Sequence, residues 1–249
     1  MKRRQVLASA AAAGALAGSG CLGSAREEYP WPVVDEEALS GWERLDELTD
    51  EYAVTYWGIE ALTVHERTYT YDHSAFRDSL RNLSGDEVDR SLARFVASRM
   101  TLEGIGRPFA TPERLVDDAM RGIEAGFRER GMEAIERVEP SAPLPETDGE
   151  LVEYRGAMPI PAFTREVEAY GVSTTVEFEG DDLDMEGVFA VWKPESDTTY
   201  VAGGAFPAAD ALGTLVPEAS GLDVATLLDL EFDPARFRET IVALVEATG

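Results

Sequence analysis

The amino-acid sequence predicts an α+β domain, with an antiparallel sheet of about five to eight strands and helices packed on one face. Three observations favour this fold class. Strand-like runs outnumber helical patterns, several of them follow one another as hairpins, and strands and helices do not alternate regularly. Hydrophobic residues make up 44% of the 249 residues, which is ample for a core. We therefore expect residues 36–249 to form a single domain.

The expected strands are runs in which β-branched and aromatic residues are frequent. They cover residues 42–47, 52–57, 62–71, 94–102, 133–139, 151–157, 165–178, 186–193 and 199–206, and the first of these is also compatible with a helix. The last two flank a turn that begins at Pro194, which predicts a hairpin. Residues 186–193 are apolar on both sides, which favours a central strand. Pro159 and Pro161 predict an edge or a loop before residues 165–178.

The clearest helix signal covers residues 111–130. Thr111 can cap the start, Pro112 suits the first helical position, and Gly131 is typical of a helix end. One side of this helix is apolar and carries Leu115, Val116, Ala119, Met120, Ile123 and Phe127. We expect that side to pack on strand 186–193, against either of its two apolar sides.

Two further helices are expected at the ends of the domain. Ser74 is expected to cap the first, whose inner side carries Phe76, Leu80 and Leu83. Asp233 and Pro234 are expected to begin the second. Its buried stripe consists of Phe237, Ile241, Leu244 and Val245.

Residues 82–87 allow two interpretations. Ser84 and Glu87 fit a capping box, which predicts another short helix through residue 92. Asn82-Leu83-Ser84 is also an N-glycosylation sequon, and Asn82 is the only asparagine in the chain. Asn82 is therefore a candidate glycosylation site.

Residues 1–20 have the features of an export signal peptide. Arg3 and Arg4 give a basic start, and small apolar residues follow to Gly18. The apolar run from Val6 to Gly18 has 13 residues. As a helix it would reach about 20 Å, less than the roughly 30 Å hydrocarbon core of a membrane. The paired arginines predict twin-arginine translocation, with the general secretory route as the alternative.

The segment Ser19-Gly20-Cys21-Leu22-Gly23 resembles the lipobox of haloarchaeal lipoproteins. The resemblance implies that Cys21 is lipidated and becomes the mature N-terminus, with residues 21–35 forming a lipid-bearing tether. Cys21 is the only cysteine, so no disulfide competes for it. The alternative is a secreted protein in which Cys21 is discarded or left free.

The chain is strongly acidic, with 48 acidic and 22 basic residues. Without the three basic residues of the signal, residues 21–249 carry a net charge of −29. This balance resembles that of proteins from extreme halophiles, whose acidic surface stays hydrated in molar salt. At about 1 M salt the Debye length is about 3 Å, so neighbouring carboxylates repel one another little. We expect no nucleic-acid partner, because phosphate and this surface carry the same charge.

The two histidines and an acidic run are the candidates for metal ligands. His65 and His73 lie eight residues apart, or about 26 Å on a strand, too far to share one ion. Both are expected to be ordinary strand or cap residues. Asp182 and Asp184 imitate the start of a calcium loop, but Lys193 stands where the bidentate glutamate is needed. An acidic hairpin loop is the favoured interpretation, with a weak cation site made by Asp181, Asp182 and Asp184 as the alternative.

The expected function is that of a lipid-anchored extracellular surface protein, a non-enzymatic binding or envelope-support module held at the membrane. No catalytic, cofactor-binding or metal-binding residue is predicted.

Gly203-Gly204 is expected to mark a bulge or a tight helix contact, not a phosphate loop. A long helix before several hairpin strands resembles PsbP/Mog1-like folds. The alternatives are an extracellular solute-binding lipoprotein, which needs two lobes, and an extracellular hydrolase.

Overall fold

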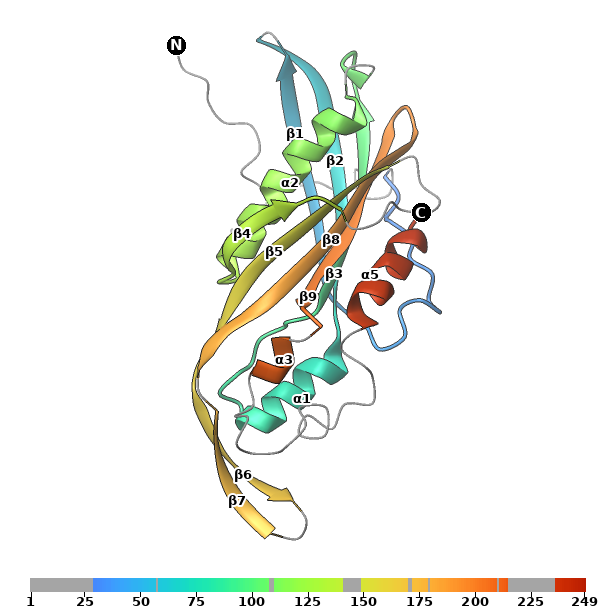
Figure 1. The fold of residues 1–249 in the computed structure, drawn as a ribbon. Coiled ribbons are helices and arrows are strands. Elements are labelled where there is room, and N and C mark those ends of the chain that lie inside the picture. The colour runs from blue at the N-terminus through green and yellow to red at the C-terminus, as the bar shows by residue number, and fades with distance from the viewer. Residues whose placement is uncertain are drawn as a thin grey trace, which may run out of the picture.

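Seven strands form one antiparallel sheet in the order β1-β2-β3-β9-β8-β5-β4 (Figure 1). The computed structural model describes residues 29–56, 58–107, 110–140, 149–169, 172–178, 180–209, 211–214 and 236–249. In chain order the strands of the sheet are β1 (Glu43–Tyr56), β2 (Ile59–Asp72), β3 (Arg94–Glu103), β4 (Glu133–Val138), β5 (Glu150–Ile160), β8 (Asp181–Glu195) and β9 (Thr198–Pro207). The predicted antiparallel sheet is therefore confirmed, and strands make up more of the fold than the prediction of an α+β domain suggested.

Most strand predictions are confirmed, and two are wrong in their connections. Residues 42–47 and 52–57 belong to one long edge strand, β1, instead of two strands. Residues 165–178 do not form one strand. The chain reverses between β6 (Phe163–Ala169) and β7 (Val172–Phe178), which pair as a separate hairpin. This hairpin extends beyond the end of the sheet, and Phe163 stacks on Phe178 at its base at 4.4 Å (Figure 1).

The described helices are α1 (Ser74–Ser84), α2 (Pro112–Glu129), α3 (Ala211–Thr214) and α5 (Phe237–Glu246). The helix predicted over residues 111–130 is confirmed as α2, and Thr111 is its N-cap residue. The buried stripe predicted for the C-terminal helix is confirmed in α5. Asp233 and Pro234, its predicted start, lie outside the described residues.

Helices pack on both faces of the sheet, so the prediction of a single covered face is wrong. On β8, Phe189 contacts Phe127 of α2, with ring centroids 5.7 Å apart. On β9, Gly204 lies under Ile241 of α5. Gly204 pairs with Val188, the neighbour of Phe189, and adjacent strand residues point to opposite sides. We call these two sides the α2 face and the α5 face.

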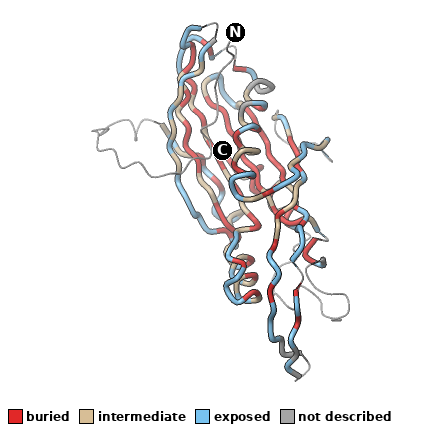
Figure 2. Tube along the Cα trace, turned by 90° about the vertical axis from the view of Figure 1, so that its left-hand side faces the viewer, coloured by how far each residue is buried: buried red, intermediate tan, exposed pale blue. Residues whose placement is uncertain are grey.

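The strands between these helices are buried on both faces (Figure 2). Val188, Ala190 and Trp192 point to the α5 face, whereas Phe189 and Val191 point to the α2 face, and all five are buried. β8 lies between β9 and β5, which confirms the predicted central strand.

Residues 29–35 form a strap along the α5 face. Tyr29 stacks on His65 at 4.0 Å, and Trp31 stacks on Tyr69 at 4.7 Å. Val33 then exchanges two backbone hydrogen bonds with Gly249, at 2.9 and 2.8 Å. Residues 29–35, which were expected to belong to the tether, thus pack against the sheet and the C-terminal end of the chain.

The chain after α1 is a loop, so the helix predicted from Ser84 through residue 92 is wrong. Gly85 adopts the left-handed conformation that ends α1, with φ of 63°. The Ser84 hydroxyl accepts a hydrogen bond from the Val88 amide at 2.9 Å instead of capping a new helix. At the other end of α1, His73 is the N-cap in place of Ser74, and its Nδ1 accepts from the Phe76 amide at 3.3 Å.

Candidate functional site

A cavity of about 350 Å³ lies on the α2 face, under the C-terminal end of α2. It is bounded by the central strands β3, β9 and β8, by Met158 of β5 and by the loop between α1 and β3. Its charged lining residues are Asp89 and four arginines, Arg77, Arg90, Arg94 and Arg130. Its large apolar lining residues are Leu92, Val96, Phe127, Met132, Met158, Met185 and Phe189. Four arginines around one hollow stand out in a chain with 48 acidic and 22 basic residues.

Local structure explains why there is space beside Arg94. Arg94 is the first residue of β3 and pairs with Ala205 of β9, which in turn pairs with Gly187 of β8. On the α2 face, Ala205 and Gly187 are therefore the neighbours of Arg94 on the next two strands. Both are small, so they leave space next to the Arg94 side chain. Phe127 of α2 covers Gly187 from above and lines one side of the cavity.

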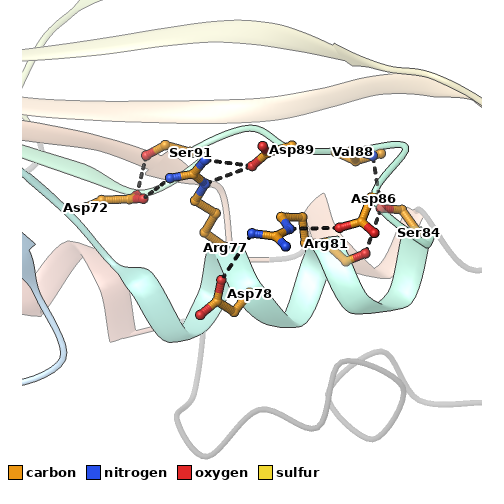
Figure 3. Close-up of polar contacts among 9 residues, drawn as sticks. All are labelled: Asp72, Arg77, Asp78, Arg81, Ser84, Asp86, Val88, Asp89 and Ser91. Carbon is orange, nitrogen blue, oxygen red and sulfur yellow. Dashed lines mark hydrogen bonds and ion pairs between the residues drawn. The ribbon is translucent and has the colours of Figure 1, made fainter. Parts of the chain in front are cut away.

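Arg77 is held in place by carboxylates (Figure 3). Its Nε and Nη2 both donate to Asp89 Oδ1, at 3.0 and 2.7 Å. Its Nη1 lies 3.7 Å from Oδ2 of Asp72, a buried carboxylate that also accepts a hydrogen bond from Ser91. The hydrogen bonds to Asp89 raise the pKa of Arg77, so its charge is fixed and neutralised.

The loop that carries Asp89 is itself anchored to α1 (Figure 3). Arg81 Nε donates to Asp86 Oδ1 at 2.9 Å, next to the Ser84–Val88 bond. Asp86 has φ of 68°, an uncommon value for a residue other than glycine. This wall of the cavity is therefore a fixed structure.

Arg94 and Arg130 differ from Arg77 because no carboxylate of the described residues lies within ion-pair distance of either guanidinium. The Nε of Arg94 is buried and has no hydrogen-bond partner in the described part of the chain. Arg130 Nη1 donates to the Gly126 carbonyl of its own helix at 3.0 Å. Burial lowers the pKa of both groups, and the charge of Arg130 lowers the pKa of Arg94 further. An anion bound between them would relieve this cost.

Arg90 is also without an ion pair in the described chain. Its Nη1 donates to the Pro159 carbonyl at 3.3 Å and lies 3.7 Å from the Met158 sulfur. These contacts tie the loop wall to β5 and leave the charge of Arg90 at the edge of the cavity.

A second polar cluster on the α2 face lies outside the cavity. Glu66 of β2 is buried, and its Oε1 accepts from Ser98 at 2.9 Å and from Thr68 at 3.0 Å. Burial raises the pKa of Glu66. Tyr52 of β1, next to Glu66, also has its pKa raised by burial. No cation of the described residues faces Glu66, so this cluster is polar without being an ion pair.

The histidines predicted as ordinary residues take no part in the cavity. His65 lies in β2 between Glu51 at 3.2 Å and Glu103 at 3.6 Å. His73 is the cap of α1, and its ring meets Trp42 and Phe237 edge-on. Burial lowers the pKa of His73, in keeping with a neutral cap. Ser91, which lines the cavity, thus has no histidine beside it among the described lining residues.

The remaining sequence candidates lie apart from one another. Asp182 and Asp184 stand exposed within β8, so the predicted acidic hairpin loop is wrong. No group of three metal-binding side chains occurs in the described ranges. Asn82 is exposed in the last turn of α1, whereas Ser84 of its sequon is buried. Arg3, Arg4 and Cys21 lie outside the described residues.

Gly204 is confirmed as a tight helix contact. A methyl group added there would meet Arg94 O and lie 2.5 Å from Ile241 Cδ1. β9 keeps a regular register with β3 through Gly203 and Gly204, so the alternative of a bulge is wrong.

The sequence interpretation missed the cavity arginines. They come from α1, a loop, β3 and the residue after α2. In each of these elements an arginine at that position is ordinary, so none of the four stands out in the sequence. The available signal was arginine density: residues 77–99 contain five arginines in an otherwise acidic chain. That density indicates a local excess of positive charge but not which side chains converge.

Comparison with known proteins gives a family without a function. None of the described helices is long and apolar enough to cross a membrane. The chain matches no curated protein and no solved structure significantly. Residues 31–249 match the family model described as a domain of unknown function, DUF6517. The chain therefore belongs to the DUF6517 family.

Proposed function

We propose that this protein is an exported, lipid-anchored binding protein that captures a small anionic molecule in the arginine-lined cavity. The observation that carries the binding role is the pair Arg94 and Arg130, which face the cavity without a carboxylate partner in the described chain. In a protein with more than twice as many acidic as basic residues, two arginines that line one cavity without an ion pair in the described chain indicate a ligand of opposite charge.

Two alternatives to this role have less support. The described residues form a seven-stranded sheet with helices on both faces and a two-stranded hairpin, not the two lobes of the common solute-binding lipoproteins. A hydrolase of the serine type needs a histidine base, and the described lining of the cavity contains none. A non-enzymatic binding module remains the function that the site supports best.

The anion-binding role is tested with sulfate as the probe, by calorimetry on the folded protein. Arg94→Gln should weaken sulfate binding about tenfold or more, the cost of losing one charge-assisted contact. The matched control is Arg155→Gln, an exposed arginine of β5 outside the cavity lining, which should change the affinity less than about twofold. Equal effects of the two variants would contradict the proposal.

Export and anchoring rest on residues 3–23 and need a separate test. Cys21→Ser should release the protein into the medium or leave the precursor uncleaved. Arg3 and Arg4 changed together to lysine should block export if the twin-arginine route is used. Membrane retention of a normally processed Cys21→Ser protein would remove the lipid anchor from the proposal.

A further inference from the structure

We infer that the ligand of the cavity is an amphipathic oxyanion, with one carboxylate or phosphate headgroup on an apolar body of roughly eight non-hydrogen atoms. This inference rests on the proposed function and names the class of ligand. It follows from the lining of the cavity, which combines Arg94 and Arg130, two arginines without an ion pair in the described chain, with buried apolar side chains. We call these two parts of the lining the polar wall and the apolar floor.

The polar wall has capacity for one headgroup. Arg77 is already satisfied by Asp89 and Asp72. Arg94 and Arg130 remain without a carboxylate among the described residues, and the buried Nε of Arg94 has no acceptor there. Two guanidiniums match the two or three oxygens of one carboxylate or phosphate, which arginine binds in a bidentate manner.

The floor of the cavity is apolar. Met132, Met158 and Met185 are all buried, and Phe127 and Phe189 complete this side. Thioether side chains adapt to ligands of irregular shape, and an aliphatic or aromatic body would cover them. A headgroup alone, such as acetate or sulfate, would leave this floor unused.

Volume sets the size of the body. The cavity measures about 350 Å³. At about 30 Å³ for each water-sized atom, it holds roughly twelve non-hydrogen atoms. Octanoate and octyl phosphate are of this size, whereas acetate fills only a fraction of the space.

Molar salt would favour such a ligand over inorganic anions. At about 1 M salt, charge attraction is screened within about 3 Å, and chloride is present in excess. Burial of an apolar body is not screened in this way. An amphipathic anion can therefore bind where a purely ionic one is displaced.

The test compares octanoate, octyl phosphate, acetate and 1-octanol on the folded protein in about 2 M KCl, by calorimetry. Octanoate or octyl phosphate should bind at least about 100-fold more tightly than acetate, and 1-octanol should bind at least about tenfold more weakly than the better of the two. Whichever amphiphile binds more tightly identifies the headgroup as a carboxylate or a phosphate. Octanol binding equal to that of the amphiphiles would overturn the inference, because the arginines would then have no role.

Two cavity variants separate the headgroup from the body. Arg94→Gln should reduce octanoate affinity about tenfold or more and leave octanol binding unchanged. Met158→Gln should reduce octanoate affinity about tenfold and leave acetate binding unchanged, whereas the volume-conserving control Met158→Leu should stay within about threefold. Circular dichroism verifies that each variant is folded, and Met132→Gln replaces Met158→Gln if the latter is not.

Failure of this inference and failure of the proposed function give different results. If acetate and sulfate bind as tightly as octanoate and all depend on Arg94, the anion site stands and the amphipathic ligand is wrong. If no anion shows binding that depends on Arg94, the proposed binding function itself is wrong.

Discussion

The two faces of the sheet are built from the same strands but differ in what covers them. On the α5 face, aromatic rings pack against one another: Tyr71 meets Phe95 at 5.9 Å, and Trp192 stacks on Tyr200 at 5.3 Å. On the α2 face, the same strands present Arg94 and Glu66, and a cavity remains. Because successive residues of a strand alternate between faces, one face can be closed for stability while the other is left open for a ligand.

The largest loss of stability is expected for Phe127→Ala on the α2 face. Phe127 is buried against Phe189 and Tyr154, and loss of a buried aromatic typically costs about 3–5 kcal/mol. Such a loss is a large share of a total stability of roughly 5–15 kcal/mol. Urea unfolding should show it directly. Arg121→Ala, on the exposed side of α2, is the control and should change the free energy of unfolding by less than about 1 kcal/mol. Small effects from both would mean that α2 does not hold this face.

The next largest loss of stability is expected when a methyl group is added to a glycine on the α5 face. The same addition on the α2 face should cost less. Gly204→Ala would place it 2.5 Å from Ile241 Cδ1 on the α5 face, and overpacking of this kind costs about 3 kcal/mol. Gly187→Ala points to the α2 face, where the nearest atoms are 3.4 Å away, and should cost less than about 1 kcal/mol. Thermal unfolding of the two variants is the measurement. A similar loss in both would remove the difference in packing between the faces.

A smaller loss is expected where the strap closes the α5 face. Trp31→Ala removes a stacked ring on Tyr69 and the contact of the Arg67 guanidinium, 5.1 Å from the Trp31 ring. Together these contacts are worth about 1–2 kcal/mol. Limited proteolysis should then cut the chain near residue 31 earlier than in the parent protein. Unchanged stability together with an unchanged cleavage pattern would show that the strap adds nothing to this face.

The smallest change, of opposite sign, is expected at Glu66 on the α2 face. Its pKa in the folded protein is raised above the usual 4.5, mainly by burial. As the pH rises above that value, the unfolded chain ionises first, so this carboxyl makes the fold less stable at neutral pH than at acid pH. Glu66→Gln keeps an acceptor for Ser98 and Thr68, removes this pH dependence and should gain up to about 1 kcal/mol at pH 7. If the stability difference between pH 4 and pH 7 is the same in the variant and the parent, the assignment is contradicted.

The parts of the fold that sequence could predict are those with local signals. α2 was predictable because Thr111, Pro112 and Gly131 mark its ends and an apolar stripe marks its side. β8 was predictable as central because both of its sides are apolar. The reversal between β6 and β7 was not, because a single Gly171 within a strand-like run also fits a bulge.

The candidate site was harder to predict than the fold. The capping box at Ser84 had the right residues, but Gly85 ends the helix before a new one can begin. Arg94 looks like the polar first residue of a strand, and Arg130 looks like the basic end of a helix. Neither residue is therefore unusual for its place in the sequence. Only the register that places Ala205 and Gly187 beside Arg94 creates the cavity, and register is a long-range property.

The strap also has a consequence for the order in which the protein is made. Val33 bonds to Gly249, so one of the first residues of the domain is locked by a residue that is synthesised 216 positions later. At about 5–20 residues per second, this delay lasts roughly 10–40 s. Throughout that time, Val33 lacks this hydrogen-bond partner. Tyr29 and Trp31 can stack on β2 before then, but the backbone bonds of the strap form only after α5 has been made.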